Sequence, residues 1–471
     1  MSHASIAAGR YQQFRTGVFA GLIEETRPLP GWNEPMPELQ LQSLWFSGEF
    51  GTEFTTTEGQ RLVVRDFGEW NSGAGPDFAN CAVLLDGKVI QGDIELDPDV
   101  RDWERHNHGS NPGYNNVALH LFIHGPAEGR AFTRTAEHRE VPQVQLRPDM
   151  LSEGFVKPAG LAAARLGRCA TPLSAMPEAA VASLVEASAQ HRLQRKAARM
   201  HACVQAHGRE QAVYQTLAQT LGYRGNQRPF TVLAQRLPLR RLLAEEPVAR
   251  EALLFGIAGF LDTTSFDHSK AETRSYLRDL WERWWKLRGD FMRWRESPQS
   301  LPWKVAGSRP GNHPERRLGA LVTLLAHWNK VFKPLKQAGA WNLRQWGHVL
   351  ESLHHDYWDL HYTLASAASA KPLAMIGQTR VNEMLANAVY PLLLPERPEV
   401  WKEYLELPAL LDNQKVRRAS LRLFGETPLA RVFQKKLHHQ QGLLQIYEDF
   451  CLEDDSACAG CPFPERLTQW R

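Results

Sequence analysis

Three carboxylates stand at one end of an expected β-hairpin, in the stretch AGPDFANCAVLLDGKVIQGDIELD at residues 74–97. They are Asp77 near its start and Glu95 and Asp97 near its end. Carboxylates are disfavoured inside strands, and like charges on facing strands repel each other. A divalent cation such as Mg²⁺, which binds one or two carboxylates together with water and substrate phosphate, offsets this repulsion. The pattern therefore indicates a metal site, and the alternative is a polar sheet edge whose acids face water.

The loop of this hairpin decides whether the acids meet. A three-residue loop that includes the Asp-Gly pair at residues 86–87 would pair Leu84 with Lys88. The same offset, followed along both strands, places Asp77 opposite Glu95. A two-residue loop would place the two acids on opposite faces of the sheet. Because the three-residue loop also separates apolar from polar side chains better, we predict that register.

The composition is that of an ordinary globular protein, with 471 residues, of which 43% are hydrophobic and 23% charged. The formal net charge of +3 excludes the class of strongly basic nucleic-acid coat proteins. The N-terminal residues lack the apolar run of a secretory signal, and no stretch approaches eighteen consecutive apolar residues. We therefore expect a cytoplasmic protein with no membrane partner. Its six cysteines then indicate metal or redox roles and not disulfides.

The pattern of apolar residues changes along the chain and predicts an α+β protein. Residues 1–34 are loosely patterned, and we interpret them as an N-terminal arm. In residues 35–158, one helical segment and several short strands predict a mixed-sheet domain. Residues 159–450 repeat the i, i+3, i+4 spacing of amphipathic helices and predict a large all-helical domain. Residues 451–471 form a cysteine-rich C-terminal segment.

The order of the acidic residues resembles the core of the restriction-endonuclease-like, or PD-(D/E)XK, nuclease superfamily. Glu38 lies on the expected first helix, Pro76-Asp77 supplies the PD pair, and Glu95 lies on the next strand. The resemblance implies a restriction-endonuclease-like N-terminal domain in which Asp77 and Glu95 bind Mg²⁺ or Mn²⁺ and Glu38 assists. In that superfamily the position of Asp97 is usually a lysine that helps to place the attacking water. This chain departs from the pattern there.

The chain is also similar, over most of its length, to an uncharacterised family of bacterial proteins classed as a domain of unknown function. Short stretches carry this resemblance: GPDF (75–78), GDIE (92–95), DWERHNH (102–108), LH (119–120), RPGNHPERR (309–317) and the cysteine-rich C-terminus. The resemblance implies a shared domain layout and no particular activity.

Three histidines follow the acids. His106 and His108 lie in DWERHNHG, and His120 lies in the next expected strand. Where the usual lysine is missing, an imidazole beside the metal can act as a general base or contact the phosphate, because its ordinary pKa of ~6.5 is close to neutrality. Two alternatives stay open. The three histidines bind Zn²⁺ with a carboxylate, as in a zinc hydrolase, or His106 and His108 merely hold a surface loop.

The cysteines near the C-terminus predict a second metal site. The candidate ligands are Cys169, Cys451, Cys458 and Cys461, with Cys81 and Cys203 as competitors for the place of Cys169. The spacing Cys458-Ala-Gly-Cys461 suits Zn²⁺ or an iron-sulfur cluster. Some exonucleases of the PD-(D/E)XK superfamily have a similar layout, with one remote cysteine and three near the C-terminus, which implies a structural 4Fe-4S cluster. The alternative is a redox-active or simply reduced pair of thiols.

Basic and aromatic residues are interleaved between residues 271 and 340, with fourteen Lys or Arg against six Asp or Glu. The tryptophans of this stretch are Trp281, Trp284, Trp285, Trp294, Trp303 and Trp328. Such a mixture can bind phosphates and stack on bases, and the alternative is a helix pair with tryptophan in its core and arginine facing water. Two further groups are candidate nucleic-acid contacts: Arg309, Asn312, Arg316 and Arg317 in RPGNHPERR, and Arg192, Arg195 and Lys196 in HRLQRKAARM.

These features predict a metal-dependent nuclease that hydrolyses phosphodiester bonds of DNA or RNA. The predicted catalytic residues are Glu38, Asp77, Glu95, Asp97, His106 and His108. A cation bound by Asp77 and Glu95 would lower the pKa of the attacking water. The alternative is a catalytically inactive protein of the same fold that binds nucleic acid or a protein partner.

Overall fold

Two compact units make up the computed structural model of this chain. Unit 1 comprises Met1–Leu29, Glu153–His201 and Gln378–Arg471, and unit 2 comprises Pro30–Ser152 and Ala202–Gly377. The residues that the structure describes are 3–20, 36–125, 131–151, 171–261, 271–296, 299–306, 308–336, 343–409, 414–452 and 463–470. The two units therefore alternate along the chain. The consecutive boundaries expected from composition, at residues 34, 158 and 450, stay a prediction.

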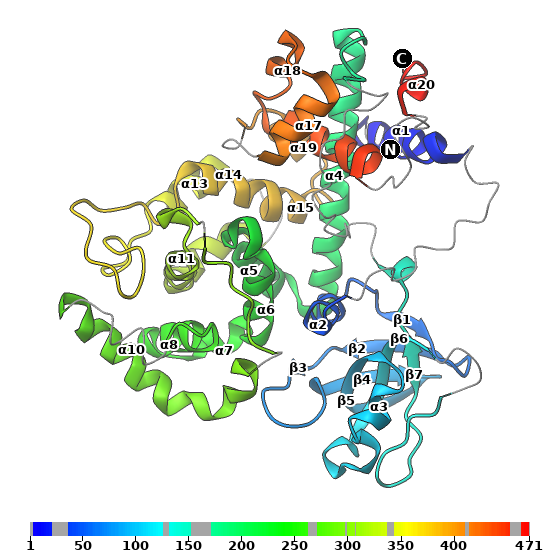
Figure 1. The fold of residues 1–471 in the computed structure, drawn as a ribbon, viewed down its shortest axis with the longest axis vertical. Helices are drawn as coiled ribbons and strands as arrows, with labels where there is room; N and C mark the ends of the chain where they lie inside the picture. Colours follow the sequence, from blue (N-terminus) through cyan, green and yellow to red (C-terminus); the bar gives the residue numbers. More distant parts are fainter. Residues whose placement is uncertain are drawn as a thin grey trace. The chain divides into compact units, whose positions relative to one another are not determined.

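A seven-stranded mixed sheet, coloured blue to cyan in Figure 1, forms the first part of unit 2. Its strand order is β1-β2-β4-β5-β6-β7, and β3 also pairs with β4. The neighbours β5–β6 and β6–β7 run parallel, and the other neighbours run antiparallel. The strands are β1 (Glu53–Thr55), β2 (Arg61–Asp66), β3 (Glu69–Trp70), β4 (Phe78–Leu85), β5 (Lys88–Asp99), β6 (Val117–His124) and β7 (Gln143–Gln145). A mixed sheet followed by a largely helical region confirms the predicted α+β class.

The turn between β4 and β5 has two residues and not three. Leu85 pairs with Lys88, and the loop residues Asp86 and Gly87 have φ angles of 46° and 86°. Positive φ at both loop residues is the conformation of a type I′ turn, which Asp-Gly favours because its twist matches that of the strands. The predicted three-residue loop is therefore wrong.

A β-bulge near the start of β4 shifts the register of the hairpin by one residue. Within it Asn80 has a φ angle of 60°, a conformation that asparagine adopts more readily than most side chains. Beyond the bulge Phe78 lies opposite Ile94. The bulge thus cancels the difference that the shorter turn makes, and Asp77 lies beside Glu95 as the sequence predicts.

Helix α2 connects the sheet with the helical part of unit 2, because it contacts both β5 and α6. Its residues Trp45 and Phe46 are buried, and the ring of Phe46 stacks on that of Phe78 with centroids 5.8 Å apart and an angle of 14°. This packing places the first turn of α2, which carries Glu38, next to the end of the hairpin.

The helices of unit 2 are mostly short. Those in the described residues are α2 (Glu38–Phe46), α3 (Asp102–Arg105), α5 (Arg209–Leu221), α6 (Gln227–Arg236), α7 (Leu239–Ala244), α8 (Pro247–Ile257), α10 (Arg274–Leu287), α11 (Pro314–Ala326), α12 (Trp328–Phe332) and α13 (Leu343–Glu351). The 3-10 turns are η1 (His108–Ser110), η2 (Pro112–Tyr114), η3 (Pro148–Met150), η4 (Tyr223–Gly225), η5 (Ala271–Thr273), η6 (Arg288–Arg295), η7 (Pro310–Asn312) and η8 (Lys333–Leu335).

Unit 1 is helical. Its elements are α1 (His3–Ala20), the larger part of α4 (Glu178–His207), α14 (Gln378–Met384), η9 (Leu385–Val389), α15 (Tyr390–Leu393), α16 (Val400–Leu405), α17 (Gln414–Phe424), α18 (Pro428–Val432), α19 (Leu437–Tyr447), η10 (Glu448–Leu452) and α20 (Phe463–Leu467). Tyr11 on α1 is fully buried and donates a hydrogen bond to Asp449 Oδ2 at 2.9 Å. The described part of the expected N-terminal arm is therefore a packed helix.

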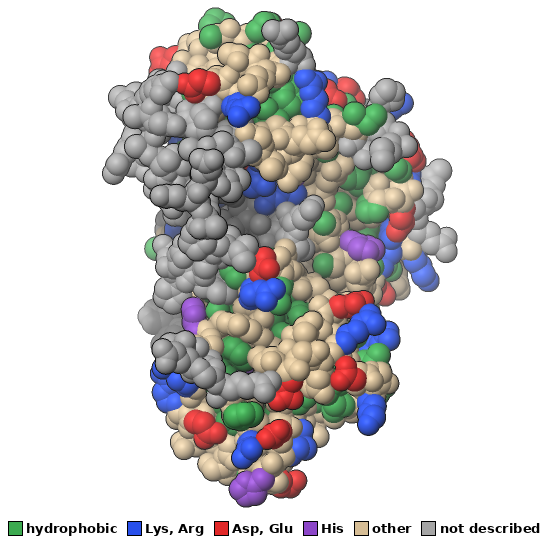
Figure 2. Space-filling model, turned by 90° about the vertical axis from the view of Figure 1, so that its right-hand side faces the viewer, with side chains coloured by type: hydrophobic (Ala, Val, Ile, Leu, Met, Phe, Trp, Pro, Cys, Tyr) green, Lys and Arg blue, Asp and Glu red, His purple; other side chains and the backbone are tan. Residues whose placement is uncertain are grey.

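The surface mixes charges of both signs. On the face shown in Figure 2, acidic and basic side chains are interspersed, in keeping with 55 basic and 52 acidic residues in the whole sequence. Among the described residues, no helix has both the length and the apolar character needed to cross a membrane.

Candidate functional site

Four carboxylates from three elements come together at one end of the sheet. Asp77 immediately precedes β4, Glu95 and Asp97 lie on β5, and Glu38 begins α2. The three sheet acids are buried, with 7%, 6% and 3% of their surface exposed. The Asp77 amide donates to Glu95 Oε2 at 2.9 Å, and the Leu96 amide donates to Asp77 Oδ2 at 3.2 Å. These bonds fix two acids side by side and use only one oxygen of each.

Burial raises the pKa of all four acids. The pKa of Asp77 rises to about 7, through burial first and the negative charge of Glu38 second. Burial also raises the pKa of Asp97 to about 7. The pKa values of Glu95 and Glu38 rise for the same reason, with neighbouring carboxylates as the next cause. The anionic form is therefore unfavourable here unless a cation is bound, and a divalent cation would favour it.

Arg293 of η6 brings a positive charge to this site from the helical part of unit 2. Its guanidinium lies 3.7 Å from Asp77 Oδ1 and donates to the carbonyl oxygens of Gly73 and Gly75 at 2.7 and 3.0 Å. It thereby holds the loop that precedes Asp77, and its charge offsets part of the rise that burial causes in the pKa of that acid. Arg293 was not among the predicted site residues, and its one signal in the sequence is its place in the basic stretch 271–340.

Two amide side chains complete the surroundings of Glu38. Gln42, one helical turn later, donates to Glu38 Oε1 at 2.9 Å, and its side chain also bonds to Asp77. Gln299 donates to the same oxygen of Glu38 at 3.4 Å. Gln42 was not among the predicted site residues, although its i, i+4 spacing from Glu38 on the expected helix indicates that the two side chains meet.

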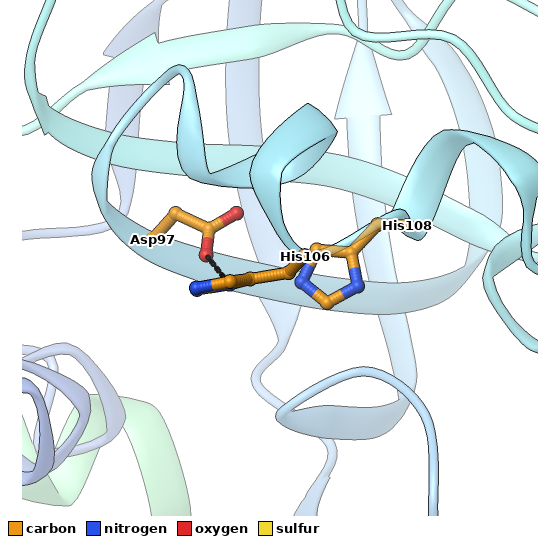
Figure 3. A group of neighbouring side chains, drawn as sticks. All are labelled: Asp97, His106 and His108. Carbon is orange, nitrogen blue, oxygen red and sulfur yellow. Dashed lines mark ion pairs between the residues drawn. The ribbon is translucent and has the colours of Figure 1, made fainter.

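Two histidines face the acids from the segment after α3. Figure 3 shows Asp97 on β5 with the ring of His106 pointing toward its carboxylate and His108 beside it. One ligand atom from each of these residues lies within 4.8 Å of the other two. His106 Nδ1 is 3.6 Å from Asp97 Oδ1, and His108 Nε2 is 3.3 Å from Glu95 Oε1. Burial lowers the pKa of His108 to about 4, so this ring is neutral at pH 7 and can bind a metal.

The loop of these histidines is rigidly built. The ring of His108 stacks on Tyr114 with centroids 4.0 Å apart, and Asn107 between the two histidines has a φ angle of 58°. The buried side chain of Trp103 donates from Nε1 to the carbonyl oxygen of Arg134 at 3.0 Å. These contacts fix the direction of His108 without a bound ion.

His120 has a different place from the other two histidines. It is fully buried on β6, and its Nδ1 lies 2.6 Å from Thr133 Oγ1, which accepts a bond of 2.6 Å from Gln143 Nε2. His120 Nε2 lies 3.2 Å from Asp97 Oδ2, and no hydrogen bond joins these two buried atoms. Among the described residues, the group of neighbouring ligand atoms contains Asp97, His106 and His108 but not His120, which does not support the zinc-hydrolase alternative with three histidine ligands.

The arginines of RPGNHPERR lie elsewhere in unit 2. Arg316 is buried and donates to four carbonyl oxygens, those of Trp358, His361, Leu373 and Ala374. Arg317 donates to Asn312 Oδ1 at 2.7 Å. Both arginines line a cavity of about 310 Å³, and Arg309 precedes the 3-10 turn at its edge. Because its donors already bond to backbone carbonyl oxygens, Arg316 stabilises the fold. Phosphate binding by the arginines of RPGNHPERR stays a prediction.

The basic residues of α4 belong to unit 1, whereas the carboxylates belong to unit 2. Arg192 forms an ion pair of 2.6 Å with Glu448, and Arg195 is buried. Lys196 Nζ donates to Asn387 Oδ1 at 2.8 Å and to Gln441 Oε1 at 2.9 Å, and burial lowers its pKa to about 7. The structure thus brings these residues together in a polar cluster of unit 1, and their contact with nucleic acid stays a prediction.

The predicted cysteine site falls largely outside the described residues, which include neither Cys169 nor Cys458 nor Cys461. Cys451 lies on η10, partly buried against the core of unit 1. Cys81 is buried and donates to the Phe67 carbonyl oxygen at 3.3 Å, and Cys203 is buried with Sγ 3.4 Å from Gln215 Oε1. The two competitors for the fourth ligand thus have partners in their own surroundings.

Comparison with known proteins places this α+β chain, with its buried acids and adjacent histidines, in a family. The family described as "Protein of unknown function (DUF2851)" matches residues 38–408, and the chain belongs to it. The match includes every carboxylate and histidine of the site and ends before the C-terminal cysteines. No curated protein and no solved structure gives a match.

Proposed function

We propose that this protein is a metal-dependent nuclease that hydrolyses phosphodiester bonds of DNA or RNA. The observation that carries the proposal is the convergence of Glu38, Asp77, Glu95 and Asp97, whose pKa values are all raised by burial. Perturbed acids gathered in this way are typical of catalytic and metal sites. Their order along the helix and the hairpin also resembles the PD-(D/E)XK core, which supports the same activity.

The donor atoms fit a divalent cation. Asp77 and Glu95 would hold it through the oxygens that the backbone bonds leave unused, and Asp97, His106 and His108 offer a second group of donors. Because imidazole suits first-row transition metals better than Mg²⁺, the mixed donor set favours Mn²⁺. A bound cation would acidify water and offset the charge of the phosphate.

The chain's own side chains supply the remaining roles. His106 is half exposed, with 51% of its side chain accessible, and lies 3.6 Å from Asp97. Where Asp97 and His108 serve as the second group of donors, the imidazole of His106 is not a ligand and can accept a proton from water or return one to the leaving oxygen. Arg293 supplies a positive charge beside Asp77, and we assign it to the phosphate in place of the lysine that is missing at Asp97.

A second candidate function is binding without catalysis. Asp97 occupies the position where the resembling nucleases usually have a lysine, and this favours a protein that has kept the fold and lost the reaction. Such a protein would bind the cation and nucleic acid through the same acids and arginine.

The test uses the purified full chain with Mn²⁺, Mg²⁺ or Zn²⁺ and end-labelled single- and double-stranded DNA and RNA. We expect cleavage with Mn²⁺ that falls at least a hundredfold in Asp77→Asn and in Glu95→Gln. The matched control is Asp99→Asn, which removes an acid of the same strand whose carboxylate pairs with Arg101 at 2.6 Å. Cleavage that persists in the Asp77→Asn, Glu95→Gln double variant overturns the assignment of the site. Binding of Mn²⁺ and nucleic acid without cleavage would support the second candidate.

A further inference from the structure

Helix α10 carries a stacked pair of tryptophans, one of them half-buried and the other exposed. Trp281 and Trp285, here called the indole pair, stack with ring centroids 4.9 Å apart and an angle of 24°. Trp285 is 49% exposed, and the Arg288 guanidinium lies 3.0 Å from its ring centroid. Two stacked indoles with a guanidinium over one of them form an aromatic surface on which another planar group can stack.

The other tryptophans nearby have structural roles that the indole pair lacks. Trp284, one helical turn after Trp281, is 2% exposed, and a Cβ added to Gly256 would lie 2.2 Å from its ring. Trp294 is 3% exposed and donates from Nε1 to the Asn71 carbonyl oxygen at 3.0 Å. The fold therefore buries Trp284 and Trp294 in its core, leaves Trp281 half-buried beside them and exposes Trp285 to solvent.

The surroundings of the indole pair are positively charged. Residues 274–295, which span α10 and η6, contain seven Lys or Arg and three Asp or Glu. Arg283 and Lys286, which flank Trp285 in the sequence, are exposed. This charge favours a polyanion over an ordinary protein surface as the ligand.

The same helical segment leads to the carboxylate site. Directly after α10, η6 carries Arg293, which lies 3.7 Å from Asp77 and bonds to the loop before it. A single strand that follows the segment from α10 to η6 passes from the indole pair to Arg293 beside Asp77. The two elements thus place a stacking group and a phosphate-binding group in succession along the chain.

We propose that the indole pair stacks on unpaired bases of single-stranded DNA or RNA bound to the carboxylate site. The inference rests on the proposed function, because it names the form of that site's substrate. A single strand exposes the faces of its bases, whereas a duplex hides them in its own stack. A base takes the place of the Arg288 guanidinium on Trp285, since a cation–π contact at an exposed site is weak. The released guanidinium then pairs with a phosphate.

The test measures binding without cleavage, by fluorescence anisotropy in EDTA. The probes are a labelled 20-nucleotide oligothymidine and a labelled 20-base-pair duplex. We expect the Trp281→Ala, Trp285→Ala double variant to bind the single strand about tenfold more weakly, with little change for the duplex. Trp285→Phe should keep most of the affinity. The matched control is Phe132→Ala, which removes another exposed aromatic ring with an arginine, Arg134, near its face.

The salt dependence of binding separates stacking from charge. Loss of the indoles should leave the slope of log affinity against log salt unchanged, whereas Arg288→Ala should reduce it by about one. Unchanged single-strand affinity in the double variant overturns the proposal. So does an equal loss for both probes, or no binding of either probe by the folded protein, in which case the indoles fit a protein partner.

The two proposals fail separately. Indole-dependent binding by a protein that cuts no substrate would reject the nuclease and keep the single-strand site. Cleavage that the double variant retains in full would reject the single-strand site and keep the nuclease. Circular dichroism of each variant checks that the fold is intact.

Discussion

Asp77→Asn should make the metal-free protein less sensitive to alkaline pH. The pKa of Asp77 is about 7 in the fold and has a usual value of 3.8, so the folded state binds more protons than the unfolded state between these values. The stabilisation is complete below pH 3.8 and is lost as the pH rises through 7. One pKa unit corresponds to ~1.36 kcal/mol, so ionisation of this buried acid costs about 4 kcal/mol at most.

The measurable part lies between pH 6 and pH 8. Integrated over this range, the loss of one proton with a folded-state pKa near 7 lowers the free energy of unfolding by about 1 kcal/mol. Urea unfolding in EDTA at both pH values gives this loss for the wild type and for Asp77→Asn. The wild type should lose about 1 kcal/mol more than the variant. His108 and His120, whose pKa values are lowered by burial, titrate in both proteins. The charge of Asp77 also raises the pKa of Glu95, which changes the difference in the same direction.

Added Mn²⁺ provides the second half of this prediction. At pH 8 and a hundred times its dissociation constant, a bound ion should stabilise the wild type by ~2.7 kcal/mol and the variant by much less. Equal pH dependence of the two proteins in EDTA would refute the claim that Asp77 is held as an unfavourable anion. A larger loss in Asp77→Asn would refute it as well.

Three further changes test the fold around the site. Gly319→Ala should lower the free energy of unfolding in urea by ~1–3 kcal/mol, because the new Cβ would lie 2.4 Å from the Trp358 ring, and an unchanged midpoint would contradict this packing. Arg192→Leu leaves the largely buried Glu448 without its ion-pair partner and should lower the free energy of unfolding in urea by ~3–5 kcal/mol. A decrease below about 1 kcal/mol would mean that the ion pair is solvated. Asn80→Val places a β-branched residue at a φ of 60° and should lower the free energy of unfolding by ~1–2 kcal/mol. Mn²⁺-dependent cleavage should be slower as well, and a fully active variant would show that the bulge does not position the acids.

The acids of the site were predictable because they are close in sequence. Asp77 and Glu95 are only 18 residues apart and are joined by one hairpin. The apolar patterns that predict the helix and the strands are visible within short stretches of the sequence. The predicted pairing of Asp77 with Glu95 is confirmed, but the predicted three-residue turn is wrong. The Asp-Gly pair formed its preferred two-residue turn, and Asn80 then opened a bulge that restores the offset. A turn can be predicted from its dipeptide, whereas a bulge depends on how both strands pack.

Contacts between distant segments were not predictable in this way. Arg293 bonds to Gly73 across 220 residues, and nothing in the sequence distinguished it from the other thirteen arginines and lysines of the basic stretch 271–340. His120 looked like a third metal ligand beside His106, yet the parallel pairing of β5 with β6 buries it behind Asp97. Which side chain faces a site depends on this pairing, and a single sequence gives little evidence of it.

The hydrogen bond between Tyr11 and Asp449 joins residues 438 positions apart, and this affects how the protein is made. At ~5–20 residues per second, a ribosome needs roughly 20 to 90 s to produce Asp449 after Tyr11. During this time α1 has left the ribosome without the apolar partners that cover it in the finished protein, among them Phe450 and Phe463. The last residue of unit 2 is Gly377, so this unit can fold before the C-terminal helices of unit 1 are synthesised. The first helix is therefore without these apolar partners until synthesis is almost finished.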